Sequence, residues 1–64
     1  MTHFEIYQDA EKKTRFRLRA SNGEIIVTGE SYNTIEACLD TIMVIKQQTP
    51  DATVQVLMPL YSPP

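Results

Sequence analysis

Alternating apolar and polar positions organise the first part of the chain. Within Thr14 to Ala20 the apolar residues Phe16, Leu18 and Ala20 alternate with three arginines. This period of two is typical of a strand with one face buried and the other in solvent. A looser alternation over residues 4–7 and a β-branched run over residues 25–28 predict two further strands.

The segments between these runs predict an antiparallel meander. Asn22-Gly23 suits a two-residue type I′ turn, in which both central residues adopt a positive φ. The mostly polar residues 9–13 predict a longer loop before the second run. These turns pair Phe4 with Leu18, Glu5 with Arg17, Ile6 with Phe16, Leu18 with Val27, Arg17 with Thr28, Ala20 with Ile25 and Arg15 with Glu30. The apolar side chains of the meander then share one face, and the arginines lie on the other.

A helix is predicted to follow. Asn33 with Glu36 three residues later is typical of a capping box, so we expect the helix to begin near Thr34. An apolar stripe at helical spacing is wide enough to cover the apolar face of the meander. Its members are Ile35, Cys38, Leu39, Ile42, Met43 and Ile45. Pro50 is expected to end the helix, and Lys46 lies near that end, where a cation suits the helix dipole.

Alternation returns after the helix. Residues 52–57 place Val54 and Val56 on one side of an extended segment, which predicts a last strand. Residues 58–64 contain three prolines and are expected to form a tail outside the sheet. We therefore predict a domain over residues 1–57 and a Pro-rich C-terminal tail over residues 58–64. The predicted class is α+β, an antiparallel three-stranded meander followed by a helix and a last strand (βββαβ).

The length of the chain indicates why a second copy is expected to complete this fold. A chain of 64 residues buries only about 60% of the surface that its unfolded form exposes, so it usually needs a disulfide, a metal or a partner subunit. Cys38 is the single cysteine and His3 the single histidine, which excludes an internal disulfide and leaves few ligands for a zinc site. Homodimerisation is the remaining source of stability.

Charge and hydropathy argue against several partners. The formal net charge of −2 gives the chain no overall attraction to nucleic acid or anionic lipid. The longest apolar run, residues 42–45, is far shorter than the about 20 residues that span a membrane. The first three residues lack the features of a signal peptide, and a lone thiol suits a reducing compartment. We expect a cytoplasmic protein with no membrane partner.

Several stretches together resemble a known family. They are residues 4–9, residues 15–26 around the Asn-Gly-Glu turn, Tyr32, Cys38, Ile42, Lys46 and residues 50–52. In their order and their amino-acid sequence they resemble the YegP-like family, small bacterial domains of unknown function, over about residues 3 to 57. The resemblance implies a βββαβ unit that often occurs as a tandem repeat, so a single unit would form a homodimer that imitates two repeats. It implies no activity, cofactor or catalytic residue.

Five basic residues form a candidate site for an anion or an acidic partner. They are Lys12, Lys13, Arg15, Arg17 and Arg19. Alternate residues of a strand are about 6.6 Å apart, roughly the spacing of neighbouring phosphates. The predicted pairs with Glu5 and Glu30 would neutralise much of this row. We therefore favour a structural role for it and keep an anion or nucleic-acid binder as the alternative, without expecting nucleic acid as a partner.

Other reactive residues fit structural roles better than catalytic ones. Cys38 lies on the apolar stripe, where a cysteine behaves as a small hydrophobe. His3 has no second histidine with which to bind a metal. Gly23 and Gly29 are isolated and form no phosphate-binding loop. We predict no enzyme, no metal and no cofactor, and the remaining alternative is a small enzyme whose site forms between two subunits.

Apolar residues on faces that a single unit leaves uncovered are the candidate dimer interface. They are Tyr7, Ile26, Val44, Val54, Val56, Leu57, Leu60 and Tyr61. The scattered hydrophobic residues found on most protein surfaces are the alternative explanation. The predicted function is a non-enzymatic binding or protein-interaction module that acts as a homodimer, with no ligand named by the sequence.

Overall fold

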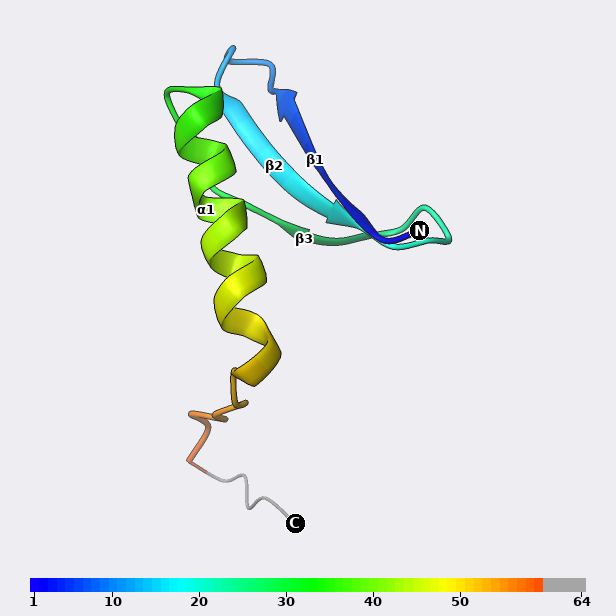
Figure 1. Cartoon of the computed structure of the whole chain (residues 1–64), viewed down its shortest axis with the longest axis vertical. Helices are drawn as coiled ribbons and strands as arrows, with labels where there is room; N and C mark the ends of the chain where they lie inside the picture. The colour runs from blue at the N-terminus through cyan, green and yellow to red at the C-terminus, as the bar shows by residue number, and fades with distance from the viewer. Residues whose placement is uncertain (60–64) are drawn as a thin grey trace.

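Two consecutive hairpins and a long helix make up the computed structural model, which describes residues 1–59 (Figure 1). The strands are β1 (His3–Gln8), β2 (Thr14–Arg19) and β3 (Ile25–Thr28). They form one antiparallel sheet in the order β1-β2-β3. The helix α1 (Ile35–Gln48) lies against one side of this sheet and leads into a 3-10 turn, η1 (Thr49–Asp51). The predicted α+β class and the three-stranded meander are confirmed.

The first hairpin has the predicted register. Phe4 lies opposite Leu18, Glu5 opposite Arg17 and Ile6 opposite Phe16. Asp9 organises the loop that joins the two strands, because its Oδ1 accepts hydrogen bonds of 2.9 Å from the backbone N–H groups of Glu11 and Lys13. Its carbonyl also accepts a bond of 2.9 Å from the N–H of Lys12, which has a positive φ of 64°. An Asp side chain that binds the backbone of its own turn fixes the loop and thereby the register.

The turn between β2 and β3 differs from the prediction. The carbonyl of Ala20 accepts a bond of 2.9 Å from the N–H of Gly23, and its own N–H donates to the carbonyl of Glu24 at 2.8 Å. Within this turn only Gly23 has a positive φ, of 91°, and the side chain of Asn22 instead accepts a bond from the Glu24 N–H at 3.0 Å. The predicted type I′ turn is therefore wrong. A three-residue loop, with a type I turn closed by a left-handed glycine, takes its place.

A β-bulge compensates for the longer loop. Leu18 lies opposite Val27, as predicted, but Arg19 lies opposite Ile25, so Ile26 is an extra residue on β3. The predicted partner of Ile25, Ala20, is wrong. Since opposite residues share a face of the sheet, the side chain of Ile25 is moved to the side that carries the arginines.

The helix α1 begins where the sequence predicts but with a different cap. Thr34 is the N-cap, and its Oγ1 accepts a hydrogen bond of 3.1 Å from the N–H of Ala37. The predicted cap at Asn33, paired with Glu36, is wrong by one residue. A hydroxyl one position later reaches the same set of unpaired N–H groups. The helix ends just before Pro50, as predicted.

The buried core is small. Among the described residues it consists of Phe16 from β2 and Cys38 and Ile42 from α1, which are exposed by 4%, 0% and 6%. Partly buried Phe4, Ile6, Tyr32 and Ile45 pack around them. The apolar stripe of α1 thus covers the apolar face of the meander, as predicted. The helix residues at the sides of this stripe stay open: Ile35, Leu39 and Met43 are about half exposed.

The described part of the chain does not show the predicted last strand. Residues 52–58 join no strand of the described part of the chain, although the backbone at Ala52 is extended (φ −72°, ψ 134°). Val54 and Leu57 are 92% and 81% exposed. The reason is topological: α1 and η1 carry the chain away from the sheet, as the orange segment of Figure 1 shows. No strand edge of the same chain lies beside the segment, so it has nothing to pair with.

Candidate interaction surfaces

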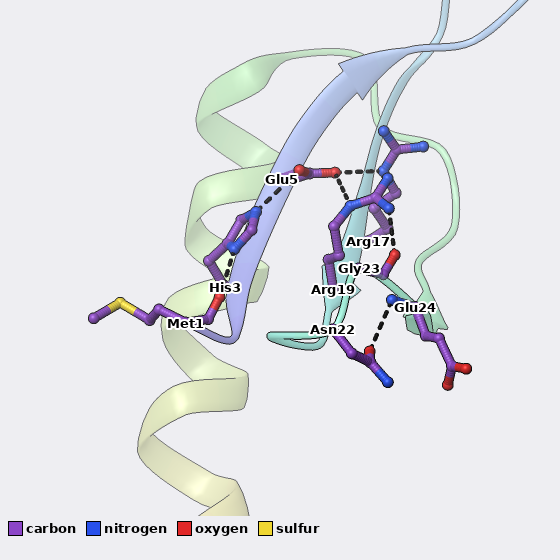
Figure 2. A network of polar contacts seen from close by, with 8 residues as sticks. All are labelled: Met1, His3, Glu5, Arg17, Arg19, Asn22, Gly23 and Glu24. Carbon is purple, nitrogen blue, oxygen red and sulfur yellow. Dashed lines mark hydrogen bonds and ion pairs between the residues drawn. The ribbon is translucent and has the colours of Figure 1, made fainter.

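The face of the sheet turned away from the core carries a network of charged side chains centred on Glu5 (Figure 2). Its Oε1 accepts hydrogen bonds from Nε of Arg17 at 2.7 Å and from Nε of Arg19 at 3.1 Å. Its Oε2 lies 3.0 Å from Nε2 of His3. One carboxylate therefore links two arginines of β2 to the first residue of β1.

Strand pairing explains why these groups meet. Glu5 and Arg17 are opposite each other, as predicted, and His3 and Arg19 form the next pair on the same face. The hydrogen bond from His3, followed by those from Arg17 and Arg19, lowers the pKa of Glu5 from its ordinary 4.5 to about 2. The carboxylate is thus ionised throughout the physiological range, and it compensates part of the positive charge of this face.

Arg15 has a different partner from the one predicted. Its Nε donates to Oδ2 of Asp9 at 2.5 Å, and its Nη1 lies 3.5 Å from the carbonyl of Gly29. The predicted partner Glu30 is wrong: the ladder pairs of β2 with β3 (Ile25–Thr28) end at Arg17–Thr28, and the next bridge joins Thr14 to Tyr32, so Arg15 and Glu30 are not paired. The bond from Arg15 is the main cause that lowers the pKa of the Asp9 carboxyl group, and the Lys13 N–H adds to it.

The three arginines are held in place along one face. The guanidinium of Arg17 lies over the ring of Tyr7, 4.6 Å from its centroid, and Nη1 of Arg19 donates to the carbonyl of Gly23 at 2.6 Å. Each arginine thus has a carboxylate at its Nε and at least one further contact. Lys12 and Lys13 lie in the loop between β1 and β2. A site for an anion on this row remains a prediction, and the carboxylates already present compete with it.

Two residues that bind the charged side chains of this face, His3 and Asp9, were not predicted from the sequence. His3 was assigned no partner, although it lies two residues before Glu5 and therefore on the same face of the same strand. Asp9 was included only as a loop residue, although an Asp at the start of a tight loop is a recognisable signal for binding the backbone of its own turn. The strand period and the turn chemistry were the signals that would have found them.

The candidate dimer residues are spread over three elements. Ile26 of β3 and Val44 of α1 are exposed by 55% and 54%. Val54, Val56 and Leu57 lie in the extended segment after η1 and are also exposed. Tyr7 is half-buried beneath Arg17 on the charged face. Leu60 and Tyr61 lie outside the described residues.

An apolar cleft of about 480 Å³ separates α1 from the N-terminal end of β1. Phe4 and Leu18 line it from the sheet, and Leu39 and Met43 line it from the helix. The polar residues that line the cleft are Thr2, His3 and Lys46. Within the described residues no group of three histidine, cysteine or acidic side chains is placed to hold a metal ion.

Cys38 occupies the centre of the core. It has no exposed surface, and burial raises the pKa of its thiol. A buried, protonated thiol is a poor nucleophile, because the thiolate is the reactive form. The described helices include none with the length and apolar character needed to cross a membrane.

Comparison with known proteins places this fold among uncharacterised small domains. Residues 9–55 match the family model described as "Domain of unknown function (DUF1508)". The chain is similar to a UPF0339 protein of Treponema denticola, with 49% identity over 51 residues, 80% of this chain and 88% of the relative. A UPF0339 protein of Methanosarcina acetivorans is 44% identical over 57 residues, 89% of this chain and 98% of the relative.

A solved structure supports the architecture independently. The NMR solution structure of a protein from Haloferax volcanii is similar to this chain with a TM-score of 0.78 and 38% sequence identity. The match covers 86% of this chain and 93% of that one. Neither the relatives nor this structure carries a name that states an activity, a substrate or a partner.

Proposed function

The chain belongs to the DUF1508 family, the UPF0339 or YegP-like proteins, and on that premise we propose that it works as a homodimeric protein-interaction module without catalytic activity. The family's function is unknown, so support for this proposal comes from the structure of the chain itself. We also keep the expectation of a cytoplasmic location, on the grounds given by the single thiol.

The observation that carries the proposal is the imbalance between buried and exposed apolar side chains. Three side chains of the described residues are buried, whereas twelve large hydrophobic residues are at least 44% exposed. A core of this size stabilises a chain of this length poorly, and exposed apolar surface is removed from water most directly by a second copy.

The dimensions of the chain support the same view. Its radius of gyration is 14.7 Å, whereas a compact domain of this length has about 11 Å. The difference arises mainly because α1 and the segment after η1 extend beyond the sheet (Figure 1). Apolar residues therefore lie on a part of the chain that has no sheet of its own to pack against.

Two open backbone edges offer a route to association. β3 is at an edge of the sheet, and its residues are all exposed, with Ile25, Ile26 and Val27 about half exposed. The segment over residues 53–57 alternates like a strand but has no strand partner among residues 1–59 of its own chain. An apolar edge strand recruits an extended segment by forming backbone hydrogen bonds. We infer that the segment of each copy contacts the sheet of the other.

Sedimentation equilibrium at micromolar concentration tests the proposal directly. We expect a mass of twice the 7.3 kDa of one chain. Val54→Asp and Val56→Asp place a charge in the inferred interface without removing a core contact, so we expect the folded monomer to predominate. Gln55→Asp, in the same segment with the opposite parity, is the matched control. A wild-type chain that stays monomeric at millimolar concentration would overturn the proposal.

The anion-binding alternative makes a separate prediction. A row of arginines that bound phosphate groups would retain RNA or inorganic phosphate at low ionic strength and lose them as salt is added. Arg17→Gln would then weaken retention. Since each arginine of the row already has a carboxylate partner, we expect no retention at any salt concentration. An enzyme with a site between subunits would instead require convergent titratable groups at the dimer seam.

A further inference from the structure

His3 ties the N-terminal end of the chain to β1 (Figure 2). Its Nδ1 lies 2.9 Å from the carbonyl oxygen of Met1, and its Nε2 lies 3.0 Å from Oε2 of Glu5. Both partners are acceptors, since a backbone carbonyl has no proton and the carboxylate is ionised. A neutral imidazole has one N–H group and donates to one acceptor only. Both bonds form together only when the ring is an imidazolium.

We propose that His3 is a protonation-dependent latch that, as an imidazolium, binds the Met1 carbonyl and thereby keeps Thr2 at the end of the apolar cleft, and that releases both residues when it loses its proton. Thr2 and His3 line that end of the cleft, next to Phe4 of β1. The neutral ring keeps its one N–H at Nε2, where the Glu5 carboxylate is the stronger acceptor, so Nδ1 loses its proton and the bond to the Met1 carbonyl breaks. Release widens the open end of the cleft.

The groups around the ring favour the closed latch. The Met1 carbonyl and the Glu5 carboxylate raise the pKa of His3 above its ordinary 6.5, and the N-terminal amine opposes them. Arg17 and Arg19 of β2 also oppose the imidazolium, because they share the carboxylate of Glu5.

From the helix, Lys46 lines the same cleft and adds a fourth opposing positive charge. The two direct bonds outweigh these more distant groups, so the latch opens at a higher pH than that at which an unperturbed histidine loses its proton.

The latch goes beyond the proposed homodimer and does not depend on it. All of its atoms belong to one chain, and its bonds form on β1 rather than on the edge strand β3. Failure of either proposal would therefore leave the other standing.

An NMR titration of the full chain from about pH 5 to about pH 9 tests the latch. We expect the His3 ring to titrate with a midpoint above 6.5. Over the same transition, the backbone order parameter of Thr2 should fall from the rigid range, about 0.85, to below about 0.6. The resonances of Phe16 and Tyr32 in the core report whether the fold is intact throughout.

Three variants separate the latch from a general effect of pH. His3→Gln should leave Thr2 mobile at every pH, because its amide has one donor nitrogen in place of the two ring nitrogens that bind Met1 and Glu5. Glu5→Gln should move the midpoint of His3 downward, because a neutral amide oxygen favours the imidazolium less than a carboxylate does. Glu24→Gln, which removes a carboxylate without a bond to His3, should leave the midpoint unchanged. A His3 midpoint at or below 6.5, or a Thr2 order parameter that is equal at both ends of the titration, would rule the latch out.

Discussion

Gly29 packs directly against the ring of Phe16, the buried aromatic residue of the core. A Cβ atom at this position would collide with three carbon atoms of the ring. The N–H of Gly29 also donates a hydrogen bond of 2.9 Å to the carbonyl of Phe16, which holds the two residues together. Close approach, rather than a left-handed backbone, is what requires a glycine here.

Gly29→Ala is therefore expected to destabilise the fold by about 1–3 kcal/mol, the usual cost of forcing an extra methyl group into a packed site. Urea unfolding followed by tyrosine fluorescence or circular dichroism measures it. The cost should be smaller when the ring is shortened by Phe16→Leu, because the methyl group then has room. Equal costs in both backgrounds would show that the ring is not the cause.

Lys12 has a positive φ of 64°, in the left-handed region that a side chain with a Cβ adopts at a cost. Lys12→Gly should therefore stabilise the protein by about 0.4–1 kcal/mol. Lys13→Gly, one residue on, should destabilise it, because the backbone there is not left-handed and glycine adds only freedom to the unfolded chain. Thermal unfolding of both variants at one protein concentration tests this prediction. A loss of stability in Lys12→Gly would contradict it.

Thr34 rather than Asn33 caps α1, so the two residues make opposite predictions. Thr34→Ala should cost about 1 kcal/mol, because the Ala37 N–H loses its acceptor. Asn33→Ala should change the unfolding free energy by less than about 0.5 kcal/mol, as expected for a surface position. Chemical denaturation of both variants decides between the caps, and a larger cost at Asn33 would restore the capping box.

Glu5 makes the stability of the folded chain depend on pH in the acid range. Its folded-state pKa of about 2 is below the ordinary 4.5, so the folded state binds the proton less readily than the unfolded state. Its contribution is present above about pH 4.5 and is lost as the pH falls toward 2. Glu5→Gln should be less stable than the wild type at neutral pH, and the difference should shrink in acid. Denaturation midpoints across this range measure it, with Glu24→Gln as the control that keeps the wild-type slope.

The sequence by itself determined the parts of the fold that depend on local periodicity. Alternation over Thr14–Ala20 set which side chains of β2 face the core, and an apolar stripe set the buried face of α1, because both periods follow from backbone geometry. The pair Glu5–Arg17 followed from the length of the first loop, so one contact of the candidate site was predictable as well.

Only the tertiary structure decided the features in which several local choices compete. A two-residue and a three-residue loop both suit Asn22-Gly23, and the difference moved Ile25 to the other face of the sheet. Arg15 pairs with Asp9 and not with Glu30, because the ladder pairs of β2 and β3 end at Arg17–Thr28 and the next bridge joins Thr14 to Tyr32.

Residues 52–57 are the clearest example of a feature that the sequence alone does not decide. A strand needs a neighbour to bind its backbone, and alternation along one segment carries no information on whether a neighbour lies within reach. The chain direction at the end of α1, which is a property of the whole fold, left this segment without a partner.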